Sequence, residues 1–241
     1  MLSIEGLTKV YKNSDRKAVD DLYLQLAEGE IFGFLGKNGA GKSTTIKCIT
    51  GILPFEIGKI TIDGFDIQDQ PKEAKMRIGY VPDNHAVYEK MTAREYIYYM
   101  GILYGATASE IKERSEIYLK MFSLDNVADN QIRSYSHGMK QKVSIIAAII
   151  HNPKLWILDE PLMGLDPQSS MEIRNFMEQY AHDYGNTIFF SSHNIDLVEK
   201  LCDRVAIIKD GILLEIIDVQ QFKLESVISL ERYFIESTME C

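Results

Sequence analysis

The sequence of 241 residues predicts an α/β fold built around a phosphate-binding loop. Residues 30–35 are apolar enough for a buried strand, residues 36–44 are rich in glycine, and residues 43–52 have the pattern of a helix. A second apolar run, residues 155–158, ends in two acidic residues. A strand, a glycine-rich loop and a helix, followed later by a strand that ends in acids, are typical of proteins that bind phosphate compounds.

The loop at residues 36–44 fits the pattern G-x-x-x-x-G-K-[ST], which cradles phosphate groups. Its glycines let the backbone approach a ligand closely, and its N–H groups and the following helix favour anions. We expect Lys42 to reach the β- and γ-phosphates, Ser43 to hold Mg²⁺ and Thr44 to add a phosphate contact. The predicted nucleotide contacts of the loop are Asn38, Gly39, Ala40, Gly41, Lys42, Ser43 and Thr44.

The two acids after the second strand complete the chemistry that such a loop requires. Asp159 is placed to hold Mg²⁺ through its water shell, and Glu160 is placed to act as general base on an attacking water. A strand that ends in a solvated acidic turn is the alternative, and the upstream loop favours the functional interpretation.

Composition indicates a single domain, residues 1–241, and limits its partners. Hydrophobic residues make up 46% of the chain, which is ample for a packed core. No run approaches the roughly 18–20 apolar residues that span a bilayer, and no signal peptide is evident, so we expect a cytoplasmic protein. The net charge of −9 argues against binding to nucleic acid. Cys48, Cys202 and Cys241 are widely separated, and we expect them to be reduced.

Further segments resemble the nucleotide-binding subunit of ATP-binding cassette (ABC) transporters. Residues 134–142 resemble the signature motif of that family, residues 161–166 its D-loop, and residues 190–193 a strand that ends in its switch histidine. The resemblance covers the whole chain. It implies a P-loop NTPase core of the RecA-like type with an antiparallel β subdomain, and a helical subdomain inserted at about residues 84–150.

The resemblance also assigns residues outside the loop to ATP. Tyr11 stands where the family stacks an aromatic ring on adenine, and Ala18 where it contacts the ribose; a half-buried strand tyrosine is the alternative for Tyr11. His193 stands where the family places an imidazole against the γ-phosphate, and a helix cap ahead of Asn194 is the alternative. Asp166 would lie at a dimer seam, although Leu-Asp-Pro alone is only a helix-start signal.

The signature segment implies a second subunit. Tyr135, Ser136, His137, Gly138 and Met139 lie at the start of a helix predicted over residues 136–150, whose positive end favours anions. In the family this end contacts ATP bound to the other subunit, which implies an ATP-dependent dimer. Symmetry favours a homodimer, with a heterologous partner as the alternative. The resemblance also implies a separate membrane-spanning permease, and hence a peripheral location at the inner face of the cell membrane.

Two departures from the family pattern have consequences. Asp83 replaces the glutamine that normally touches Mg²⁺ and the attacking water, so we expect an altered hydrolysis rate or metal dependence. In the signature, His137 replaces a glycine and Met139 a glutamine. This variant resembles a branch rich in bacterial exporters and favours export. His137 is either a group that titrates near neutral pH or a surface residue at the helix start.

Two amphipathic helices are predicted between these motifs, over residues 92–104 and 108–122. Tyrosines are frequent in this region, and with Met91 and Met100 they form either the core of the subdomain or a groove for a membrane protein. These tyrosines are Tyr80, Tyr88, Tyr96, Tyr98, Tyr99 and Tyr104.

The two ends of the chain carry simpler patterns. Residues 12–17 are predicted to form a polar turn between two strands. Residues 205–208 and 212–217 predict a hairpin, and a helix is expected from about residue 226.

These features together predict the ATP-binding and ATP-hydrolysing subunit of an ABC transporter. Its ligands would be ATP and Mg²⁺, and its catalytic residues Lys42, Glu160 and His193. Two alternatives keep the fold and change the role: an ABC-type ATPase with no transport function, and a regulatory nucleotide sensor. The first usually carries coiled-coil insertions, zinc sites or two cassettes, and the second is disfavoured by the intact acidic pair and histidine.

Overall fold

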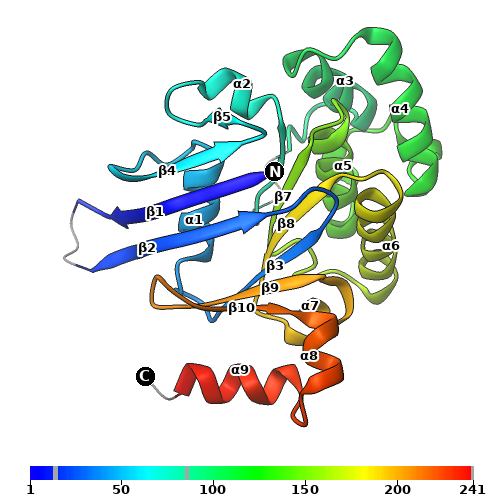
Figure 1. Ribbon diagram of the computed structural model, residues 1–241. Helices are drawn as coiled ribbons and strands as arrows, with labels where there is room; N and C mark the ends of the chain where they lie inside the picture. The colour runs from blue at the N-terminus through cyan, green and yellow to red at the C-terminus, as the bar shows by residue number, and fades with distance from the viewer. Residues whose placement is uncertain (13–15, 85–86, 240–241) are drawn as a thin grey trace.

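The computed structural model describes residues 1–12, 16–84 and 87–239, which form two sheets and the helices around them (Figure 1). The smaller sheet has four strands in the order β2-β1-β4-β5, and β1 pairs antiparallel with both of its neighbours. The bounds are Leu2–Val10 for β1, Lys17–Leu26 for β2, Ile57–Ile62 for β4 and Phe65–Asp66 for β5. This sheet is the predicted antiparallel β subdomain.

The larger sheet has six strands in the order β10-β9-β3-β8-β7-β6. Its strands from β9 to β6 are parallel, and β10 pairs antiparallel with β9. The bounds are Ile31–Leu35 for β3, Ile78–Val81 for β6, Leu155–Asp159 for β7, Thr187–Ser192 for β8, Arg204–Lys209 for β9 and Ile212–Asp218 for β10. Since β7 and β8 flank each other and β8 pairs with β3, the loops at their carboxyl ends meet at one edge. The predicted fold class is confirmed.

Helices cover this sheet and form a separate group at one end (Figure 1). α1 spans Lys42–Ile49, α2 Pro71–Lys75, α5 His137–Ile149, α6 Pro167–Glu178 and α7 Ile195–Leu201. α3 (Ala93–Leu103) and α4 (Ala108–Met121) lie between β6 and α5, each opened by a capping box that starts at a threonine. Short 3₁₀ turns at Asp125–Val127 and Ile132–Ser134 lead into α5, and a π-helical turn, Gln179–Asp183, extends α6.

The core is divided into two hydrophobic clusters by the larger sheet. Side chains alternate along β7, so that Trp156 and Leu158 face one cluster, with α5 and α6, while Leu155 and Ile157 face the other. Trp156 is fully buried, and its ring lies 5.3 Å from that of Tyr180. The larger sheet is therefore packed on both faces, as its nearly continuous apolar strands require.

The tyrosine-rich region divides between core and surface. Tyr96 is 6% exposed, whereas Tyr88, Tyr98 and Tyr99 are exposed. Burial raises the pKa of Tyr96 to about 12. Tyr96 therefore belongs to the core of the subdomain, whereas the exposed tyrosines are available for a partner, and their role in a groove for a membrane protein stays a prediction.

Three local expectations need correction or comment. The helix after the loop ends at Ile49, earlier than residue 52, because Gly51 adopts a positive φ of 64°. One helix was missed: α8 spans Val219–Glu225 and is capped by the Asp218 side chain, which accepts from the Gln221 N–H at 2.8 Å. The closing helix, α9, spans Leu230–Met239 and so begins later than expected.

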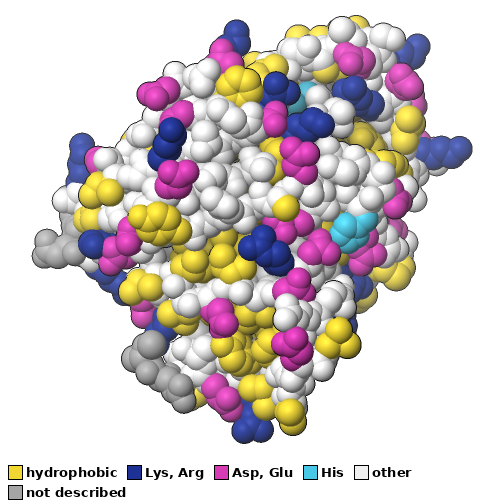
Figure 2. All heavy atoms as spheres, in the orientation of Figure 1, with side chains coloured by type: hydrophobic (Ala, Val, Ile, Leu, Met, Phe, Trp, Pro, Cys, Tyr) yellow, Lys and Arg dark blue, Asp and Glu magenta, His cyan; other side chains and the backbone are white. Residues whose placement is uncertain are grey.

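The remaining expectations concern the turn, the cysteines and membrane segments. Residues 13–15 of the polar turn lie outside the described residues, as does Cys241. Cys48 and Cys202 are free thiols, and burial raises the pKa of Cys48 to about 11. Within the described part of the chain, no helix combines the length and apolar character that a bilayer crossing needs. On the face in Figure 2, acidic and basic side chains are interspersed, and hydrophobic side chains gather between the β9–β10 hairpin and α9.

Candidate nucleotide-binding site

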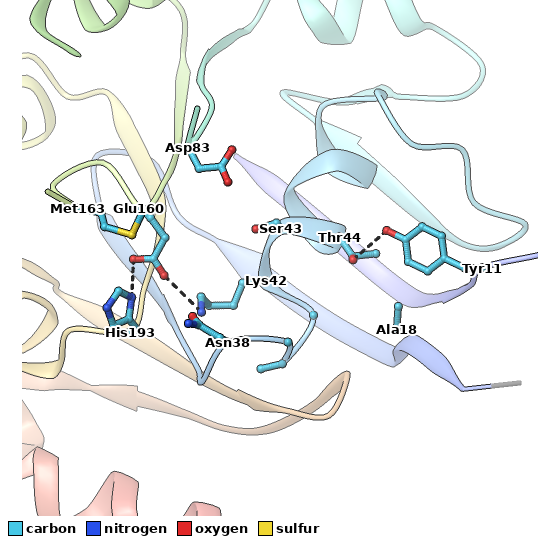
Figure 3. A pocket seen from close by; sticks show the side chains of 13 residues that line it. Tyr11, Ala18, Asn38, Lys42, Ser43, Thr44, Asp83, Glu160, Met163 and His193 are labelled. Carbon is cyan, nitrogen blue, oxygen red and sulfur yellow. Dashed lines mark hydrogen bonds and ion pairs between the residues drawn. The ribbon is translucent and has the colours of Figure 1, made fainter. Parts of the chain in front are cut away.

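A cavity of about 480 Å³ opens where the carboxyl ends of β3, β7 and β8 meet (Figure 3). Its walls combine the glycine-rich loop with side chains from distant parts of the chain. The lining residues are Tyr11, Ala18, Asn38, Gly39, Ala40, Gly41, Lys42, Ser43, Thr44, Asp83, Glu160, Met163 and His193. Every residue predicted to contact nucleotide within one chain is therefore brought to this cavity, and Met163 is the lining residue that sequence reasoning missed.

The loop is shaped by a close approach of backbone at Gly41. This residue has φ of 109°, and a Cβ atom there would lie 2.5 Å from the carbonyl oxygen of Ala18. Glycine is therefore required at this position. α1 begins directly afterwards, so its free N–H groups and positive dipole end face the cavity, as anion binding requires.

Backbone hydrogen bonds join the loop to two other segments. The Gly211 N–H, in the turn between β9 and β10, donates to the carbonyl of Ala40 at 2.8 Å. The carbonyl of Gly211 in turn accepts from the Asp20 N–H of β2 at 2.8 Å. The loop, the β9–β10 turn and β2, which carries Ala18, thus form one hydrogen-bonded unit.

Three charged or titratable side chains form a chain of contacts at the inner end of the cavity (Figure 3). Lys42 is 6% exposed, and its ammonium donates to the carbonyl of Gly36 at 2.7 Å. The same ammonium lies 3.4 Å from Oε1 of Glu160, while Oε2 of Glu160 lies 3.0 Å from Nδ1 of His193. Glu160 therefore links the phosphate-loop lysine to the histidine.

Glu160 adopts an uncommon backbone conformation, with φ of 49°. A non-glycine residue in this region is strained by an amount of order 1–3 kcal/mol, which surrounding contacts must offset. Its N–H donates to Oγ of Ser191 at 3.1 Å, and that hydroxyl donates to Oδ1 of Asp159 at 2.6 Å. The conformation of Glu160 is thereby tied to the neighbouring strand β8.

Asp159 does not line the cavity but lies directly behind it. The residue is 1% exposed, and within the described part of the chain its Oδ2 atom is buried without a hydrogen-bond partner. Burial, together with the negative charges of Asp159 and Asp83, raises the pKa of the nearby Tyr80. An unpaired buried carboxylate oxygen with hydroxyl and carboxylate neighbours fits a hard divalent cation.

Tyr11 and His193 both line the cavity, at positions that the sequence left with two interpretations each. Tyr11 lies just after β1 and is 44% exposed, so its ring is accessible to a ligand, and its hydroxyl lies 3.2 Å from Oγ1 of Thr44. The cap of α7 is Asn194, whose Oδ1 accepts from the Leu197 N–H at 3.1 Å. The ring of His193 is directed at Glu160, so the helix-cap interpretation is wrong.

The signature residues lie apart from the cavity of their own chain. Ser136 caps α5 by accepting from the Met139 N–H at 3.3 Å, and both Ser136 and His137 are exposed. Tyr135 is 6% exposed, its hydroxyl donates to the carbonyl of Val127 at 2.5 Å, and burial raises its pKa.

Asp166 caps the helix that packs against the signature segment. It accepts from the Ser169 N–H at 2.9 Å, a hydrogen bond that lowers its pKa. A Cβ atom at Gly138 would lie 2.7 Å from Oγ of Ser169. The helix-start interpretation of Asp166 is therefore correct, whatever further role the residue has.

The loop, the acidic pair and the exposed aromatic ring beside the loop define a nucleotide-binding protein of the P-loop class. The chain belongs to the ABC transporter family, whose model matches residues 19–163. It is the ATP-binding subunit of an ABC transporter, and it hydrolyses ATP to ADP and phosphate.

Several known proteins are similar to this chain. The linearmycin resistance ATP-binding protein LnrL of Bacillus subtilis (strain 168) is 40% identical over 216 residues, which are 90% of this chain and 68% of LnrL. The ABC transporter ATP-binding protein NatA of the same strain is 42% identical over 214 residues, which are 88% of this chain and 87% of NatA.

Solved structures show the same fold. One, an ATP-binding subunit of an ABC transporter, has a TM-score of 0.90 at 30% identity and covers 99% of both chains. Another is the dimeric ATP-binding cassette MJ0796 in a post-hydrolysis state, bound to ADP and Pi. Its TM-score is 0.83 at 25% identity, with coverage of 91% of this chain and 99% of that chain.

Proposed function

We propose that the chain acts as an ATP-dependent dimer that drives export through a separate membrane-spanning permease. The observation that carries this proposal is the separation of the two ATP-binding elements. The cavity holds the loop and Glu160, whereas Ser136 and the positive end of α5 are exposed elsewhere. A second copy, placed head to tail, would bring its α5 to this cavity, and the similar MJ0796 structure is dimeric.

ATP would lie along the cavity with its phosphates at the loop. Backbone N–H groups of residues 38–41 and the start of α1 hold the phosphates, and Thr44 adds a hydroxyl. Lys42 exchanges its contact with Glu160 for the β- and γ-phosphates. Tyr11 stacks on the adenine, and Ala18 packs against the ribose.

Glu160 acts as the general base. Once Lys42 has moved to the phosphates, the Glu160 carboxylate accepts a proton from the attacking water, whose oxygen bonds to the γ-phosphorus as the bond to the β-phosphate oxygen breaks. His193 holds the other carboxylate oxygen, at 3.0 Å, and donates to the γ-phosphate as charge develops there.

Two residues that line the cavity, Ser43 and Asp83, together with the buried Asp159, fit Mg²⁺. Ser43, Asp159 and Asp83 would hold the ion, which neutralises charge on the β- and γ-phosphates when it is bound. Asp159 is fixed for this role by the Ser191 hydroxyl, and Asp83 lines the same cavity as Glu160 (Figure 3).

The helical part at about residues 84–150 would receive the permease. Residues one turn apart on α3 expose hydrophobic side chains: Tyr98, Tyr99, Ile102 and Leu103. The ring of Tyr88 lies 5.9 Å from that of Tyr99 and extends this surface. A permease loop covering it would hold the protein at the inner face of the membrane. Export is supported by the signature variant and by the resistance role in the name of LnrL.

Mixing of two inactive variants tests the composite site. Lys42→Met removes the phosphate contact, and Ser136→Asp keeps a helix cap but places a negative charge against the partner's phosphate. Each variant alone should be inactive in ATP hydrolysis, while a mixture should recover activity, because half of the dimers then contain one intact site. A mixture as inactive as its components would rule out sites shared between copies of this chain.

The dependence of the ATP hydrolysis rate on protein concentration provides a second test of the dimer. For the wild type, the hydrolysis rate should rise faster than linearly with protein concentration below the dissociation constant of the dimer. A strictly linear dependence over the range in which the protein is monomeric would contradict the dimer.

A further inference from the structure

We propose that Gln141 is a positioning residue for ATP hydrolysis, which holds the Glu160–Pro161 turn against α5 and keeps the Glu160 carboxylate directed into the cavity. The inference rests on the proposed role of Glu160 as general base. Gln141 itself does not line the cavity, and it acts through the backbone that follows Glu160.

Gln141 lies in the second turn of α5 and is 1% exposed. Its Nε2 donates to the carbonyl of Pro161 at 2.8 Å. Its Oε1 is buried and has no hydrogen-bond partner within the described residues. Burying an amide with one polar atom unsatisfied is unfavourable, and an apolar side chain of similar size would avoid that cost. Packing alone therefore does not account for a glutamine here.

The hydrogen bond from Gln141 to Pro161 contacts the turn that carries Glu160, the proposed general base. Glu160 has φ of 49°, so its backbone requires support to stay in place. On one side its N–H is held by Ser191, as described above. On the other side the next residue, Pro161, is buried and accepts from Gln141. The two hydrogen bonds flank Glu160 and fix the direction of its side chain.

The same helix begins at the exposed signature end. Ser136 lies five residues before Gln141, about one and a half helical turns away. The adjacent residue Lys142 is also buried, and its ammonium lies 2.6 Å from Oε2 of Glu172 on α6. A displacement of α5 by nucleotide on the partner subunit would therefore reach Glu160 through Gln141 and Pro161.

Gln141→Met tests the proposal, because methionine has a similar length and shape but cannot donate to Pro161. Lys142→Met is the matched control: it removes the next buried polar side chain of α5, which contacts α6 and not the turn. Glu160→Gln is measured in parallel. The readouts are kcat and KM for ATP, the urea midpoint of unfolding, and hydrogen exchange of residues 160–166.

We expect Gln141→Met to lower the turnover of ATP while the apparent affinity for ATP is retained. Gln141→Met should lower kcat roughly 10- to 100-fold, as small misplacements of a catalytic group do, with KM for ATP within about twofold of wild type. Exchange in residues 160–166 should become faster. Lys142→Met should lower the unfolding midpoint and keep kcat within about threefold of wild type, since it leaves the turn intact.

Two other results would overturn the inference, and they are distinguishable from failure of the proposed function. If Gln141→Met hydrolyses ATP at the wild-type rate while Glu160→Gln is inactive, Glu160 is the base and Gln141 does not position it. If Glu160→Gln retains turnover, the role of Glu160 itself is wrong. If Gln141→Met does not fold, Gln141→Leu replaces it, since leucine is also apolar and cannot donate to Pro161. Wild-type kcat in that variant would also refute the inference.

Discussion

The ammonium of Lys42 lies 3.4 Å from Oε1 of Glu160, so the residue proposed to bind phosphate and the residue proposed to activate water neutralise each other in the free chain. While this ion pair is intact, the ammonium of Lys42 occupies Oε1 of Glu160. Binding of ATP would remove Lys42 from this pair and leave Glu160 available. The proposed base would therefore be activated by the substrate that it acts on.

Lys42→Met should weaken ATP binding by about 10- to 100-fold, the loss expected for hydrogen bonds between charged groups. Equilibrium binding of a fluorescent ATP analogue measures this effect. Lys37→Met is the control, because Lys37 belongs to the same loop but is exposed and does not line the cavity. Equal affinities for the two variants would contradict the role of Lys42.

Glu160→Gln should lower kcat by about 10²- to 10⁴-fold, the range found for general bases, while ATP remains bound. Dimer formation in ATP should persist, since the amide keeps the shape of the side chain and only the base is lost. Analytical ultracentrifugation with and without ATP, alongside a phosphate-release assay, gives both quantities. A variant that still releases phosphate at the wild-type rate would assign the base elsewhere.

Tyr11→Ala should raise the dissociation constant for ATP about 2- to 10-fold, because an aromatic stacking contact contributes about 0.5–1.5 kcal/mol. Tyr11→Phe keeps the ring and loses only the hydroxyl contact with Thr44, which is 3.2 Å long and exposed. Phenylalanine should therefore bind ATP nearly as well as tyrosine. If alanine and phenylalanine behave alike, the ring does not contact the base.

Asp83→Gln should change the rate of hydrolysis or the Mg²⁺ concentration that gives half of the maximal rate. The reason is that Asp83 adds a negative charge to the cavity that Glu160 lines, and Asp83 and the buried Asp159 both act on the nearby Tyr80. Asp83→Asn separates the effect of charge from that of length. Identical rates and identical Mg²⁺ dependence in all three proteins would remove Asp83 from the metal site.

His151 should make the protein less stable in mild acid. Burial lowers its pKa from 6.5 to about 4, so the unfolded chain binds a proton between these pH values and the folded chain does not. Its contribution to stability is complete above pH 6.5 and is lost as the pH falls towards 4, by at most about 3 kcal/mol. Its ring also stacks on Tyr104 at 4.2 Å.

Urea unfolding between pH 4 and pH 7 measures this dependence. His151→Gln should lose less stability over the range than the wild type does. Parallel curves for wild type and His151→Gln would contradict a neutral buried imidazole.

The parts of the site that could be predicted are those whose chemistry is local in sequence. The residues from Asn38 to Thr44 form one contiguous loop, and Asp159 and Glu160 end one strand, so spacing alone indicates their roles. The helix α3 was predicted from its amphipathic pattern, which is also local in sequence, and the structure adds that Thr92 and Glu95 cap its start.

The parts that were missed depend on contacts across the fold. Met163 carries no signal of nucleotide binding, and only the turn after β7 brings it to the cavity. In the sequence, Gln141 has no feature that distinguishes it from other helix residues. Its role depends on the hydrogen bond from its amide to the carbonyl of Pro161, which only the fold brings about. The start of α8 was not predicted because Asp218 is both the last residue of β10 and the N-cap of α8. The hydrophobic pattern alone does not distinguish a capping residue from the end of a strand.

The hydrogen bonds that join Ala40, Gly211 and Asp20 connect three segments that are far apart in the sequence. They involve only backbone atoms, and they fix the phosphate loop relative to β2, which carries Ala18 beside the proposed base and sugar position. The separation between the phosphate loop and Ala18 is therefore set by hydrogen bonds of the main chain. A side-chain substitution at either end would weaken a contact with the nucleotide. It would leave the distance between the phosphate loop and Ala18 unchanged, because backbone hydrogen bonds set that distance.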